Sequence, residues 1–126
     1  MSPSDERTRQ HGGASAEWRQ FERLAARFYE QRGFQILERN WQAGRKELDL
    51  IVRKDSLIAF VEVKSSRSKQ FGHPVERVTR AKVRNLTEAA KRYLQENDVE
   101  GCDFRFDVVA FVGGRLEYFP GAFTAE

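Results

Sequence analysis

The pattern of apolar and polar residues along the chain predicts two long helices. In the first, apolar side chains recur at spacings of three and four, which is typical of an amphipathic helix. They are Trp18, Phe21, Leu24, Ala25 and Phe28. Ser15 is a candidate N-cap of this helix, and Gly33 is expected to end it. The second helix follows another candidate N-cap, Thr79. Its apolar side is formed by Val83, Leu86, Ala90, Tyr93 and Leu94.

The segment between the helices predicts three strands. Residues 34–41 indicate the first strand, and residues 47–53 alternate in the manner of a second one. A short polar turn at residues 54–56 leads into the apolar run 57–63, so the second and third strands are expected to form an antiparallel hairpin. Because the third strand is apolar on both faces, we expect it in the centre of a sheet that is covered on both sides.

Two more strands are expected after the second helix. Residues 104–112 predict a fourth strand, Gly113 and Gly114 a two-residue turn, and residues 116–119 a short edge strand. The resulting order, αβββαββ, predicts an α/β fold in which helices flank a mixed five-stranded sheet. Residues 1–14 are polar and aperiodic and are expected to be a disordered tail, whereas residues 15–126 are expected to form a single domain.

The charge of the chain is informative in its distribution rather than in its sum. Twenty-two basic and nineteen acidic residues leave a net charge of only +3, which does not by itself identify a nucleic-acid partner. Between Lys64 and Arg84, however, seven basic residues stand against Glu76 alone. Such a run can be a solvated loop and helix face, or a surface that binds phosphate groups.

Other features of the sequence bear on disulfide bonds, zinc binding and the cellular location of the protein. Cys102 is the only cysteine, which excludes an intramolecular disulfide, and Cys102, His11 and His73 are too scattered for a zinc site. The sequence contains no apolar stretch of the kind found in signal peptides and no run long enough to span a bilayer. We therefore expect a cytoplasmic protein that does not contact the membrane.

Charged residues at the end of the third strand are the candidate catalytic residues. Side chains two apart on a strand share a face, so Glu62 and Lys64 point the same way, and the hairpin can bring Asp49 beside Glu62. Two such carboxylates repel by about 4 kcal/mol at 4 Å and an effective dielectric near 20, so they require a cation. A divalent metal would meet this need, and so would Lys64. Mg²⁺ or Mn²⁺ is the candidate metal, because Mg²⁺ prefers oxygen ligands and usually takes one or two carboxylates from a protein.

Metal-assisted phosphodiester hydrolysis fits this combination, with Asp49 and Glu62 as metal ligands and Lys64 positioning the nucleophile. The alternative from the residues alone is that Glu62 and Lys64 mark the solvated end of a strand and pair with each other. Serine hydrolysis, nucleotide hydrolysis and hydride transfer find no support, since the chain lacks a nucleophile elbow, a phosphate-binding P-loop and a Gly-rich dinucleotide turn.

Several segments together resemble one protein family. They are FERLAARFYEQRGFQILERNW, KELDLIVR, FVEVKSSRSKQFGHPVERVTRAK, FRFDVVAF and the closing GAF. In order and spacing they resemble the YraN-like uncharacterised bacterial proteins, which belong to the PD-(D/E)xK nuclease superfamily and look distantly like archaeal Holliday junction resolvases. The resemblance covers residues 17–123, and the paired KELDLI and FVEVK segments are its most specific part.

The resemblance implies a restriction-endonuclease-like core with Asp49, Glu62 and Lys64 at the motif positions. It also implies that Glu22 on the first helix contributes to the catalytic site, whereas the residues alone favour a solvated helical glutamate. Branched DNA as the substrate and a homodimer are implied by the same relatives. Two positions depart from the family, which commonly has glycine where this chain has Phe21 and Lys46, and both substitutions add bulk beside the proposed site.

The remaining polar residues have secondary or structural interpretations. Glu47 shares the face of Asp49 and is a secondary candidate, although pairing with Arg45 or Lys46 is equally compatible with the sequence. Asp107 lies within the fourth strand and is expected to pair with a neighbouring basic residue. His73 precedes a proline in a predicted loop and is expected to be exposed.

Two functions from different classes follow from these observations. The first is a Mg²⁺- or Mn²⁺-dependent endonuclease that hydrolyses branched or structured DNA. Its phosphate contacts would come from Arg67, Lys69, Arg80, Lys82 and Arg84. The alternative is a non-catalytic nucleic-acid-binding module that keeps the nuclease fold.

Overall fold

The computed structural model describes residues 16–67 and 78–124 and confirms the predicted α/β order. Its elements are α1 (Ala16–Gln31), β1 (Gln35–Ala43), β2 (Lys46–Lys54), β3 (Leu57–Ser66), α2 (Arg80–Glu96), β4 (Asp103–Val112) and β5 (Arg115–Phe123). The predictions for the tail at residues 1–14, for the N-cap Ser15 and for Lys69 and His73 lie outside the described residues.

The five strands form one mixed sheet in the order β1-β2-β3-β4-β5. The β1–β2, β2–β3 and β4–β5 pairs are antiparallel, which confirms the predicted hairpin of the second and third strands. β3 and β4 run parallel, as expected for strands joined by a helical crossover. The apolar strand β3 is therefore central, as its sequence predicts.

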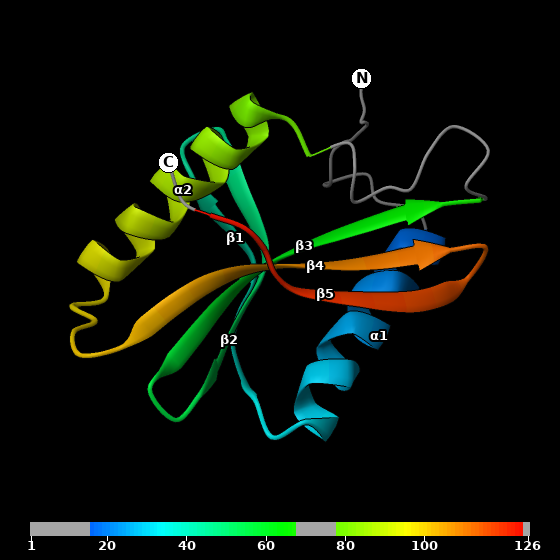
Figure 1. Cartoon of the computed structure of the whole chain (residues 1–126), viewed down its shortest axis with the longest axis horizontal. Helices are drawn as coiled ribbons and strands as arrows, with labels where there is room; N and C mark the ends of the chain where they lie inside the picture. The colour runs from blue at the N-terminus through cyan, green and yellow to red at the C-terminus, as the bar shows by residue number, and fades with distance from the viewer. Residues whose placement is uncertain (1–15, 68–77, 125–126) are drawn as a thin grey trace.

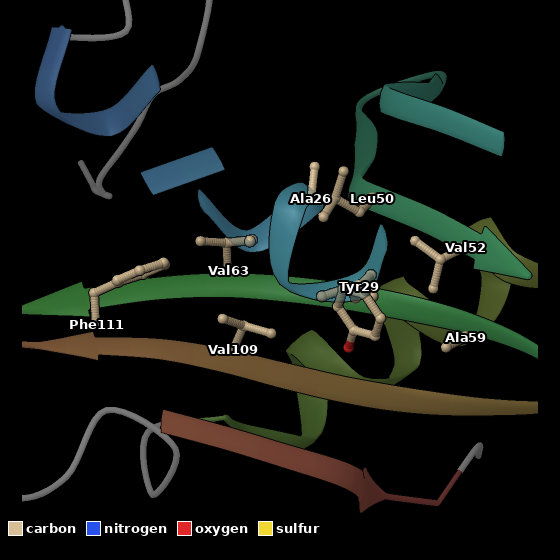
Figure 2. Close-up of a cluster of buried hydrophobic side chains, with 10 residues drawn as sticks. Ala26, Tyr29, Leu50, Val52, Ala59, Val63, Val109 and Phe111 are labelled. Carbon is tan, nitrogen blue, oxygen red and sulfur yellow. The ribbon is translucent and has the colours of Figure 1, made fainter. Parts of the chain in front are cut away.

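The two helices cover opposite faces of the sheet (Figure 1). On one face, Ala26 and Tyr29 of α1 pack against the sheet, where Val63 and Val109 lie on adjacent strands (Figure 2). On the other face, α2 packs against a second cluster that includes Phe60. Both faces of β3 are therefore buried, which explains why its sequence shows no alternation until it reaches Glu62.

The start of α2 and the length of β5 compare differently with the sequence predictions. Thr79 caps α2 as predicted, since its Oγ1 accepts a hydrogen bond from the backbone N–H of Lys82 at 3.1 Å. β5 is longer than the predicted edge strand at residues 116–119, because pairing with β4 continues past an irregularity as far as Phe123. Gly121 adopts φ +60° within this extension, a conformation that glycine accepts without steric cost.

Asp107 is the centre of a buried polar network on the α1 side of the sheet. Its carboxylate, which is fully buried, accepts hydrogen bonds from the Tyr29 hydroxyl at 2.8 Å and from Arg105 Nε at 2.8 Å. The backbone N–H of Gly121 donates a further bond at 3.0 Å. These contacts agree with the structural interpretation of Asp107, because every one of them ties one element of the fold to another or neutralises the buried charge.

In the part of the chain that the structure describes, neither helix has the length and apolar character needed to cross a bilayer.

Candidate active site

The carboxylate of Asp49 lies where β2 separates from β3. The β2–β3 ladder ends with the pair Leu50 and Val61, although both strands continue beyond it. Beyond this pair the backbone N–H of Val63 donates to Asp49 Oδ2 at 2.7 Å instead of to a backbone carbonyl of β2. The side chain of Asp49 therefore closes the end of the ladder and is held beside the residues of β3 that follow.

Glu62 neighbours Asp49 and carries two lysine contacts on one oxygen. It points toward α2, because Phe60 and Ile58, two and four positions earlier on the strand, pack in the cluster beneath that helix. Lys64 Nζ lies 3.5 Å from Glu62 Oε2, and Lys82 Nζ, from the first turn of α2, lies 3.3 Å from the same oxygen. The glutamate is thus shared between its own strand and the helix above it.

Burial and mutual repulsion dominate the electrostatics of this group. Asp49 and Glu62 are only 7% and 6% exposed. Burial raises the pKa of Asp49 well above its usual range, and the negative charge of Glu62 raises it further, while the hydrogen bond from Val63 acts in the opposite direction. Glu62 in turn raises the pKa of Lys82, which is therefore a permanent cation at neutral pH.

The donor chemistry of Asp49 and Glu62 fits a hard divalent cation. Both residues offer carboxylate oxygens, and two desolvated carboxylates side by side are stabilised by any cation that reaches them. Within residues 16–67 and 78–124, no three acidic, histidine or cysteine side chains gather closely enough to form a metal cage by themselves. Two carboxylates would be enough for Mg²⁺, which usually takes few protein ligands and keeps several waters.

Glu22 lies on α1, and neither Asp49 nor Glu62 is among the groups that most perturb its pKa. Burial is the largest influence on the pKa of Glu22 and raises it. Four residues lower this pKa, in decreasing order Trp18, Arg19, Arg39 and Asn40. Its Oε2 is buried and has no hydrogen-bond partner among the described residues. Asn40 adopts φ +52° within β1, a conformation that asparagine tolerates better than most residues.

The other predicted site residues lie at the surface or at its border. Glu47 is half-buried and contributes to the raised pKa of Asp49, so it lies in the same electrostatic environment. Arg67, Arg80 and Arg84 are exposed, as a phosphate-binding role requires.

The two departures from the family pattern have separate partners. Lys46 forms an ion pair with Glu88 of α2, which engages its ammonium group with that helix. The ring of Phe21 stacks on Phe111 of β4, with 4.5 Å between centroids. The bulk that each residue adds is therefore taken up by contacts with α2 and with β4.

The position of Lys82 differs most from the sequence-based interpretation. The sequence places it with Arg80 and Arg84 as a phosphate contact, whereas its ammonium group pairs with Glu62. One signal was present in the sequence, because the N-cap at Thr79 fixes Lys82 in the first turn of the helix. What the sequence lacks is the crossing position of that turn over β3.

The comparisons with other proteins give one consistent result. The profile of the uncharacterised protein family UPF0102 matches residues 21–111. A UPF0102 protein of Chloroherpeton thalassium is 45% identical over 91 residues, which cover 72% of this chain and 70% of the relative. A UPF0102 protein of Chlorobium chlorochromatii is 46% identical over 109 residues, with 86% and 84% covered. A third, of Myxococcus xanthus, is 39% identical over 120 residues, with 89% and 95% covered.

Proposed function

The chain belongs to the uncharacterised protein family UPF0102, and from the geometry of its buried carboxylates we propose that it is a metal-dependent endonuclease. The proposed substrate is branched or structured DNA, as the resemblance to resolvases implies. The observation that carries this proposal is the pair Asp49 and Glu62, two adjacent and nearly inaccessible carboxylates with lysine side chains against them. A fold gains little stability from such a pair, whereas metal-assisted phosphoryl chemistry depends on one.

In this proposal Asp49 and Glu62 hold Mg²⁺ or Mn²⁺. When bound, the ion supplies a water of lowered pKa and offsets negative charge on the phosphate. The hydrogen bond from Val63 fixes the orientation of the Asp49 carboxylate, so that this ligand is in place before substrate arrives. The resemblance also implies a role for Glu22, whose Oε2 is buried without a hydrogen-bond partner in the described part of the chain. Glu22 does not complete a three-carboxylate cage with Asp49 and Glu62 among the described residues.

Lys64 orients the nucleophile in the proposed reaction. Its ammonium, anchored 3.5 Å from Glu62 Oε2, donates hydrogen bonds to the attacking water and to a phosphate oxygen. The water oxygen forms a bond to phosphorus, the bond from phosphorus to one ester oxygen breaks, and a proton lost from the water reaches the leaving oxygen through solvent. Exposed Arg67, Arg80 and Arg84 hold the flanking phosphates.

The test is a pair of assays on an end-labelled four-way junction and a matched duplex, with Mg²⁺ or Mn²⁺. Glu62→Gln and Lys64→Met should each reduce cleavage at least about a hundredfold, the usual effect of losing a positioned catalytic group. Binding of the junction in Ca²⁺ should be retained. Glu96→Gln is the matched control, because Glu96 pairs with Arg92 on the exposed side of α2.

The alternative outcome is equally clear. If the unmodified protein binds the junction and cuts neither DNA with either metal, the endonuclease proposal is wrong and the chain is a non-catalytic nucleic-acid-binding module. Failure to bind any DNA or RNA at low salt would contradict both functions.

A further inference from the structure

We propose that Lys82 is a built-in counter-ion of the carboxylate pair and that it leaves Glu62 when a divalent cation binds. This inference rests on the proposed function, since it concerns the same site. It assigns to Lys82 a role other than a fixed phosphate contact: the lysine first occupies the site and then becomes available to the phosphodiester substrate.

The contact between Lys82 and Glu62 is a competitive one. Lys82 Nζ lies 3.3 Å from Glu62 Oε2, the same oxygen that Lys64 Nζ approaches to 3.5 Å. An oxygen that coordinates a divalent cation cannot keep two ammonium groups at this distance without strong repulsion between the cation and each ammonium. At least one lysine must therefore move when Glu62 binds the ion through Oε2.

Exposure indicates which lysine moves. The side chain of Lys82 is 42% exposed, whereas that of Lys64 is 24% exposed and its backbone is paired with Ala110 of β4. Lys82 also has a fixed anchor, because its backbone N–H is bound to the N-cap Thr79 while its flexible side chain reaches the glutamate. The side chain can swing into solvent without any change in the backbone of α2.

The released ammonium group would remain close to the reacting phosphate. Lys82 lies in the first turn of α2, where the helix dipole also favours anions. Its neighbours Arg80 and Arg84 on the same helix are exposed and carry the same charge. Cation binding would thus release the Lys82 ammonium from its ion pair with Glu62, so that it can contact a phosphate group of the substrate.

The first test measures Mn²⁺ affinity by calorimetry with Lys82→Met and the unmodified protein. Removing the competing ammonium should tighten Mn²⁺ binding by about tenfold or more. Lys91→Met is the matched control, since Lys91 is an exposed lysine of the same helix and should leave the affinity unchanged. Equal or weaker Mn²⁺ binding by Lys82→Met would overturn the inference.

A second test uses the unmodified protein and avoids any effect of mutation on folding. Limited acetylation followed by mass spectrometry should label Lys82 slowly in EDTA and several-fold faster with saturating Mn²⁺, with Lys91 as the internal reference. An acetylation rate of Lys82 that is the same in EDTA and in saturating Mn²⁺ would contradict the inference. Neither test requires cleavage, so a protein that shows both effects and never cuts DNA would support the role of Lys82 while refuting the nuclease.

Discussion

Val63 donates its backbone N–H to the Asp49 carboxylate at 2.7 Å, at the point where the ladder between β2 and β3 ends. A side chain thus replaces a strand backbone as the hydrogen-bond acceptor. The bond holds the carboxylate in a buried position that its charge disfavours, beside the charge of Glu62. Burial of the charged Asp49 carboxylate is therefore electrostatically unfavourable in the metal-free site.

Asp49→Asn should stabilise the metal-free protein at pH 8, because an amide keeps the hydrogen bond from Val63 without the buried charge. We expect a gain of about 1 to 3 kcal/mol in unfolding free energy, measured by urea denaturation in EDTA. Asp103→Asn, an exposed substitution on β4, is the control and should have little effect. A loss of stability in Asp49→Asn would contradict the inference that burial of the Asp49 charge destabilises the fold.

The same residue gives a pH dependence with a definite sign. The pKa of Asp49 is raised in the folded state, so the folded protein binds the proton more tightly than the unfolded chain. The stability from this group is fully present below its unfolded pKa of about 3.9 and is lost as pH rises through the folded value. The advantage of Asp49→Asn should therefore be absent near pH 3.5 and should grow with pH, in urea titrations at several pH values.

Phe21 is expected to contribute to stability through its contact with β4. Its half-buried ring stacks on Phe111, so Phe21→Ala should lower the unfolding free energy by about 2 kcal/mol. Leu24→Ala on the same helix is the matched control, because Leu24 is 38% exposed and should cost much less. If the two variants unfold at the same urea concentration, the stacked ring contributes no special packing.

Much of the fold could be predicted because local patterns agree with the tertiary arrangement. The spacing of apolar residues predicted both helices, and the continuous apolar run of β3 predicted its central position. Thr79 predicted a helix start that the structure confirms. The end of β5 could not be predicted from local pattern. Its pairing with β4 continues to Phe123, past Gly121 at φ +60°.

The candidate site was predictable in part for the same reason. Strand periodicity and hairpin register bring Asp49 and Glu62 together, because these relations are local to two consecutive strands. The contact between Lys82 and Glu62 depends on where α2 crosses the sheet, a long-range relation with no signature in the sequence. The environment of Glu22 likewise includes Arg39 and Asn40 of β1, which lie outside its own helix.

The polar network around Asp107 should be essential for folding. Asp107→Ala would leave Arg105 and the Tyr29 hydroxyl without their buried acceptor, so we expect a loss of about 3 to 5 kcal/mol. Tyr29→Phe removes one hydrogen bond and should cost only about 1 to 2 kcal/mol. Urea denaturation measures both, and a Tyr29→Phe variant that unfolds like Asp107→Ala would contradict the central position of the aspartate.

Salt dependence separates the exposed arginines from Lys82 in DNA binding. Arg80 and Arg84 are free to contact phosphates in the absence of metal, so Arg80→Met and Arg84→Met should each weaken junction binding in EDTA. Each should also reduce the slope of log affinity against log salt by about 1, the counterion release expected of one lost phosphate contact.

Lys82→Met should leave this slope nearly unchanged in EDTA, because its ammonium is engaged by Glu62. In Ca²⁺, which supports binding without cleavage in this scheme, the same variant should lose about one unit of slope as the lysine turns to phosphate. Lys54→Met is the control in both conditions, since Lys54 Nζ donates to the carbonyl oxygen of Arg32 at 2.9 Å. A Lys82→Met slope that falls equally in EDTA and in Ca²⁺ would indicate a permanent phosphate contact and would remove the reason for a cation-dependent switch.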